Sequence, residues 1–266
     1  MKAFRILLFG VVCAGAAVFA VFVLFSFTKN YSIVISSDNQ TQAARSLPNN
    51  SYEKIVYLDA TKFFGSNLSV LAGSIIGKNI LSQNPNGPQL ANAQSPIVLN
   101  QKQVTQDIAA QVYTQAVKDL TIYTEKDITR VLDAQSAIAA YTQGLKTISN
   151  AYLEPFRNKD ISVLTALVIE QNDNDARKIL LSYADASQQA LDELIKLPVP
   201  DSWVTLHLEL MNIISESRYA ALAFLTIQND PVRANIVAQN YQSLAKRFTA
   251  FTQALNNKIK QDHIIF

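Results

Sequence analysis

The sequence predicts an all-α protein, with one N-terminal transmembrane helix followed by an extracytoplasmic up-and-down helical bundle of four to five main helices. An uncharged apolar run of 22 residues, from Ile6 to Phe27, predicts the membrane span. From about residue 100 to the end, apolar residues recur three and four positions apart, as they do on one face of a helix. Clusters of Pro, Gly and Asn divide this second part into segments of helical length.

The N-terminal run is long enough to cross a bilayer. A helix of this length rises roughly 33 Å at about 1.5 Å per residue, and the hydrocarbon layer is about 30 Å thick. We therefore assign a cytoplasmic tail (1–5), a transmembrane helix (6–28) and a polar linker (29–51). The large apolar residues of this anchor, which we expect to contact membrane lipid, are Ile6, Leu7, Leu8, Phe9, Val11, Val12, Phe19, Val21, Phe22, Val23, Leu24 and Phe25.

A cleaved signal peptide is the competing interpretation of the run. Signal peptides have apolar cores of about 7–15 residues that end at a small-x-small cleavage site. The candidate sites, Ala14-Gly15-Ala16 and Val18-Phe19-Ala20, lie inside the run, so cleavage would leave an exposed apolar stub. Val12 is too bulky to precede a lipid-modified Cys13, and a pilin-type leader is missing. We therefore expect the helix to be retained.

The distribution of basic residues predicts the orientation of the anchor. Lys2 and Arg5 precede the run, whereas Lys29 is the one basic residue that follows it before Arg45. Because positive flanks stay on the cytoplasmic side, we expect the N-terminus inside and the bulk of the chain outside. A single span followed by a bundle without cysteines is common in bacterial envelopes, so we expect a bacterial inner membrane. The short tail argues against inward signalling by this chain alone.

The composition agrees with an exported domain. The one cysteine, Cys13, lies within the predicted span, so we expect neither an intrachain disulfide nor thiol redox chemistry outside the membrane. Charged residues make up 17 % of the chain and the formal net charge is +2. Such a balance gives no indication of nucleic-acid binding.

Residues 52–99 form a predicted broken helical segment that ends in a Pro/Asn/Gly loop. Within 66–81, the apolar residues Leu68, Leu71, Ile75 and Ile80 form a stripe, and Gly73 and Gly77 make a small-xxx-small pair. One interpretation is a membrane-surface or helix-pairing segment. We favour a helix that packs on the core and approaches its neighbour closely at the glycines.

Residues 100–266 form the predicted bundle domain, and helix caps and prolines delimit its helices. A helix over 101–119 is followed by one that starts near 125, because Thr124 and Asp127 resemble a capping box, and ends at Pro155. Asp160 then caps a short helix through Glu170. The predicted helices that follow are 174–197, capped by Asn172 with Asp175, then 202–228, and a last one that starts at Asp230-Pro231.

Long helices joined by short loops lie side by side and mostly antiparallel, so we expect a bundle with negligible strand content. The apolar residues of the last three helices support this arrangement. They include Ile179, Tyr183, Leu194, Trp203, Leu210, Ile214, Leu225, Val237, Leu244, Phe248 and Leu255.

Motifs that carry chemistry are missing from the sequence, so we expect no enzyme activity, no cofactor and no metal. His207 and His263 are the two histidines, and neither belongs to a metal-binding or catalytic motif. His207 is the one weak candidate for a general base or ligand; a partly buried histidine with a hydrogen bond is the simpler interpretation. A hydrolase that uses His207 remains an alternative.

Seven tyrosines, by contrast, could line a ligand cleft or an interface, although core-boundary positions explain them as well. They are Tyr113, Tyr123, Tyr141, Tyr152, Tyr183, Tyr219 and Tyr241.

Two functional hypotheses follow. The first is a membrane-anchored, non-catalytic structural or assembly protein of the cell envelope, with protein partners there. The alternative is an extracytoplasmic ligand-binding module. A closed apolar core would contradict this alternative, whereas a pocket of roughly 300 Å³ with convergent polar groups would favour it.

Overall fold

The computed structural model describes residues 58–84, 100–159 and 161–264. This part of the chain is mostly helical, which confirms the predicted all-α class. The predicted anchor (6–28) and linker (29–51) lie outside the described residues. Among the residues that are described, no helix is both long and apolar enough to cross a membrane.

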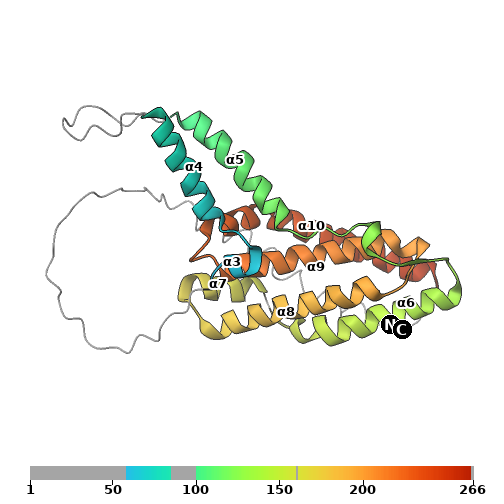
Figure 1. Cartoon of the computed structure of the whole chain (residues 1–266). Coiled ribbons are helices and arrows are strands. Elements are labelled where there is room, and N and C mark those ends of the chain that lie inside the picture. Colours follow the sequence, from blue (N-terminus) through green and yellow to red (C-terminus); the bar gives the residue numbers. More distant parts are fainter. Residues whose placement is uncertain (1–57, 85–99, 160, 265–266) are drawn as a thin grey trace.

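Four helices form the bundle: α7 (Ile161–Gln171), α8 (Asn174–Lys196), α9 (Val204–Leu225) and α10 (Pro231–Gln261). α9 lies at its centre and contacts the other three (Figure 1). The indole N–H of Trp203, just before α9, donates to Asp262, just after α10, over 2.8 Å, so these two helices run antiparallel. Apolar residues of all four helices form the main core, among them Val168, Leu180, Leu222, Phe224 and Val237.

A helical hairpin projects from one end of this bundle (Figure 1). The short helix α3 (Thr61–Phe64) leads into α4 (Leu68–Gln83), and α5 (Gln101–Lys118) returns beside it. The chain turns between α3 and α4 at Gly65, whose φ of 68° favours glycine. Leu68, Ala72, Ile75, Val112 and Ala116 form a separate small core between α4 and α5.

The predicted core-packing stripe of 66–81 agrees in part with α4. Leu68 and Ile75 are buried, but the expected close approach at the glycines is wrong. A Cβ atom added to Gly73 or Gly77 would meet nothing within 4 Å, so neither glycine packs closely against a neighbouring helix.

The prediction of a helix that starts near 125 is also wrong for its first ten residues, 125–134. Thr124 and Asp127 do form a capping box, but it caps a single 3-10 turn, Glu125–Asp127. The chain then extends through β1 (Arg130–Val131), which pairs in parallel with β2 (Val199–Pro200), and α6 (Gln135–Ile148) begins only afterwards. The pairing with β2 keeps this segment extended, because the Val199 N–H donates to the Thr129 C=O over 2.8 Å.

α6 continues into a π-helical turn, Ser149–Leu153, and a 3-10 turn, Glu154–Phe156. A further 3-10 turn, Asp201–Trp203, precedes α9. At the start of α8, Asp173 rather than Asn172 is the N-cap, and its carboxylate accepts from the N–H groups of Asp175 and Ala176. Asn172 instead ends α7 with a positive φ of 52°.

Candidate functional site: the groove beside the hairpin

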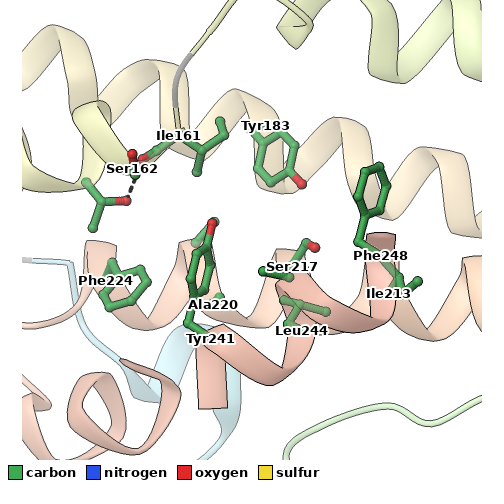
Figure 2. Close-up of a pocket in the computed structure, with 13 residues that line it drawn as sticks. Ile161, Ser162, Tyr183, Ile213, Ser217, Ala220, Phe224, Tyr241, Leu244 and Phe248 are labelled. Carbon is green, nitrogen blue, oxygen red and sulfur yellow. Dashed lines mark hydrogen bonds between the residues drawn. The ribbon is translucent and has the colours of Figure 1, made fainter. Parts of the chain in front are cut away.

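A small cavity of about 40 Å³ lies in the bundle core. Figure 2 shows the side chains of Ile161, Tyr183, Ser217 and Tyr241, one from each of the four helices, around it. Burial raises the pKa of the Tyr183 phenol. Because a water molecule needs roughly 10–15 Å³ of such space, the cavity has room for a few waters and is too small for a metabolite.

A larger groove of about 340 Å³ lies on the outside, where the end of α5 meets α9 and α10. Its walls are mainly apolar, and three of their large side chains are strongly exposed: Tyr113 (56 %), Val117 (44 %) and Ile122 (57 %). The other lining residues are Ala116, Leu120, Glu216, Tyr219, Ala220, Ile236, Val237, Asn240, Tyr241, Ser243, Leu244 and Arg247.

One end of the groove, lined by Glu216 and Arg247, adjoins an acidic cluster that also contains Glu209. The Arg247 guanidinium donates to both carboxylate oxygens of Glu209, over 3.0 and 3.2 Å, and also to Glu216. These hydrogen bonds, those to Glu209 first, raise the pKa of Arg247 above its usual value. One arginine thus binds two carboxylates, so the cluster carries a net charge of about −1 in half-exposed positions.

Tyr219, which lines the groove, connects it to a buried cluster of Asp230, Arg233 and Asp119. Asp230 caps two helices at once: it accepts from the Arg233 N–H of its own helix and from the N–H groups of Leu68 and Ser69 at the start of α4. The last two distances are 2.9 and 3.0 Å. Two positive helix ends therefore stabilise this fully buried carboxylate.

Arg233 connects the hairpin to the bundle. Its guanidinium is fully buried and pairs with Asp230 (3.0 Å) and with Asp119 at the end of α5 (2.8 Å). It also donates to the Tyr219 hydroxyl (2.9 Å) and to Ser66, and it stacks 3.9 Å from the centre of the Phe64 ring. These contacts fix α4 and α5 relative to α9 and α10, and so they set the width of the groove.

The loop after α5 is held by two polar residues of α9. The Asn212 side chain accepts from the Tyr123 N–H over 2.7 Å and donates to the Tyr123 C=O over 3.1 Å. Ser215 donates to the Thr121 C=O over 2.7 Å. Ile122, between these two fixed residues, is thereby presented to the groove.

The structure places the weak candidate His207 inside the core, away from the groove. The residue is fully buried, and its Nδ1 lies 3.1 Å from the Tyr141 hydroxyl in a hydrogen bond. Burial lowers the pKa of His207 to about 4. Its neighbour in sequence, Glu209, binds Arg247 instead. Within the described part of the chain, no three His, Cys, Asp or Glu side chains gather as they would to hold a metal ion.

Of the seven tyrosines singled out from the sequence, Tyr113, Tyr219 and Tyr241 line the groove, whereas Tyr141 and Tyr183 are buried. Sequence reasoning missed Glu209, Glu216 and Arg247. The spacing of seven between the two glutamates, which places them on one face of a helix, was a usable signal.

No family model matches this chain, and neither a curated protein nor a solved structure matches it.

Proposed function

We propose that this protein is a membrane-anchored, non-catalytic assembly or interaction protein of the cell envelope, and that its helical bundle binds a partner protein through the groove beside the hairpin. Residues 6–28 would form the anchor, with the N-terminus cytoplasmic and the up-and-down bundle on the extracytoplasmic side. The observation that carries the proposal is the row of exposed apolar side chains, Tyr113, Val117 and Ile122, along one open groove. Contiguous exposed apolar surface of this kind is typical of interaction sites.

The groove also favours the alternative of an extracytoplasmic ligand-binding module. Its volume of about 340 Å³ lies at the lower end of the range for small-molecule sites. The one cation of its acidic cluster, Arg247, is however already bound by Glu209 and Glu216, so it is not available to an anionic metabolite. A protein partner can instead cover the exposed apolar wall of the groove, so we favour it.

A pair of matched variants tests the proposal in the full chain. Val117→Glu places a charge in the groove wall, and Val163→Glu places one at an equally exposed valine of α7 outside it (44 % and 47 % exposed). After crosslinking in native membranes and purification, we expect a stable protein complex from the wild type and from Val163→Glu, and its loss from Val117→Glu. An unaccompanied monomer, or a complex that does not depend on Val117, would contradict the docking role.

The membrane anchor is tested separately. After alkaline extraction of membranes we expect the chain in the pellet, and in spheroplasts we expect added protease to digest the bundle. Recovery of the chain in the soluble fraction would contradict the anchor, and protection of the bundle would contradict its orientation.

A further inference from the structure

The groove has a length that suits one short helix. Its α10 wall runs from Ile236 to Arg247, which corresponds to about 16 Å, or three turns. The facing wall consists of the last two turns of α5 and Ile122. A helix with apolar residues at positions i, i+4 and i+7 presents anchors over about 10 Å, so three such anchors match the length of the α10 wall.

The charges around the groove indicate which charged side chain a partner helix should carry. At the acidic end, Glu209 and Glu216 together exceed Arg247 by one negative charge. Beside Tyr219, Arg233 is fully buried and engaged with Asp119 and Asp230, so it offers nothing to a ligand. An acidic lipid or a phosphate would therefore find no free cation among the residues that line the groove, whereas a basic side chain would complement its acidic end.

We propose that the groove binds an amphipathic helix of the partner protein, with three apolar anchors between α5 and α10 and a lysine or arginine that pairs with Glu216 or Glu209. The inference rests on the proposed function and adds the chemistry of the partner. The apolar anchors cover Val117, Ile122 and the adjoining wall of α10. The basic residue follows the last anchor by about one turn, where it converts the net charge of the cluster from −1 to zero.

A displayed library of 16-residue peptides tests both parts of the proposal. One face of a helical frame is randomised, and the purified full chain in detergent micelles is the target. We expect the selected peptides to carry three apolar residues spaced by three or four positions, with lysine or arginine about one turn beyond. In the best peptide, replacing that basic residue with glutamine should weaken binding by about two- to fivefold, since half-exposed ion pairs contribute up to about 1 kcal/mol.

Variants of the chain test the apolar anchors and the preference for a basic residue separately. Val117→Glu should weaken the best peptide at least about tenfold, because an unpaired charge would be buried under the ligand, while Val163→Glu should not change it. Glu209→Gln combined with Glu216→Gln should abolish the preference for a basic residue and keep the apolar anchors. Thermal unfolding of each variant checks that the fold is retained.

The outcomes distinguish failure of the inference from failure of the proposed function. If no selected peptide depends on Val117, the helix inference is wrong, and the Val117 dependence of the complex recovered from native membranes decides the docking role separately. If the peptides depend on Val117 but show no basic preference, or prefer acidic residues, the partner chemistry is wrong and the docking role stands. If octylamine binds the groove and every peptide fails, the site takes a small amphiphilic cation and the helix is excluded.

Discussion

Replacing Arg233 with methionine removes the one cation of a buried cluster and leaves two carboxylates behind. Asp230 is fully buried and the Asp119 side chain is 6 % exposed, so neither charge is well solvated. Removing one partner of a buried ion pair costs about 3–5 kcal/mol. For a domain of about 150–250 residues, each kcal/mol lowers Tm by about 2–4 °C, so we expect a decrease of roughly 6–20 °C.

A second substitution, Asp119→Asn, should change stability in opposite directions in the wild type and in Arg233→Met. In the wild type, Asp119→Asn breaks the ion pair with Arg233 (2.8 Å) and should destabilise the protein. In the Arg233→Met background, the same change removes an uncompensated charge and should restore about 1–3 kcal/mol. Lys178→Met is the control: its ion pair with Asp175 is exposed and should contribute less than about 1 kcal/mol.

Urea unfolding of the full chain in detergent measures these free energies, and hydrogen exchange locates the change. Protection should fall first in α4 and α5, which the cluster attaches to the bundle. A loss below about 1 kcal/mol for Arg233→Met, or the same sign for Asp119→Asn in both backgrounds, would refute the argument.

Two further predictions concern the bundle. Burial holds the pKa of His207 at about 4, below its ordinary 6.5, so the unfolded chain binds a proton that the folded chain does not, and stability is lost as pH falls from 6.5 to 4. The loss is at most about 3 kcal/mol. Between pH 7 and pH 4.5, the unfolding free energy of His207→Gln, measured in urea, should therefore fall by less than that of the wild type. An equal fall in both proteins would exclude His207 as a source of the pH dependence. Asn212→Ala leaves both backbone groups of Tyr123 without their partner and should cost about 1–3 kcal/mol. It should also weaken peptide binding in the groove by releasing Ile122, and wild-type affinity in a folded variant would contradict that positioning role.

Local signals in the sequence predicted much of the helical part. Asp230-Pro231 begins α10 as expected, because the cap and the proline act within one turn. The capping box at Thr124 and Asp127 is real, but a pairing with Val199, some 70 residues away, prevents the helix from following it. Caps depend on neighbours in sequence, whereas helix length here depends on tertiary contacts.

The groove could not be predicted from the sequence, because it arises where α5 lies against α9 and α10. That placement depends on contacts between residues far apart in the chain, such as Leu68 with Asp230 and Ser66 with Arg233. The tyrosines were a partial signal, since an aromatic with a hydroxyl suits a surface cleft. Nothing in the sequence distinguished Tyr113, on the groove, from Tyr141, in the core.

The double cap at Asp230 has a consequence for the order of folding. During synthesis the N–H groups of Leu68 and Ser69 leave the ribosome about 160 residues before the carboxylate that binds them. At about 5–20 residues per second this is a delay of roughly 10–30 s. Until then α4 and α5 are held together by their own small core and by the hydrogen bond from Asn79 to Asp107. Before α10 is synthesised, the apolar surface of the hairpin that Val232 and Ile236 cover is therefore exposed. During this interval the nascent protein can aggregate or bind a chaperone through that surface.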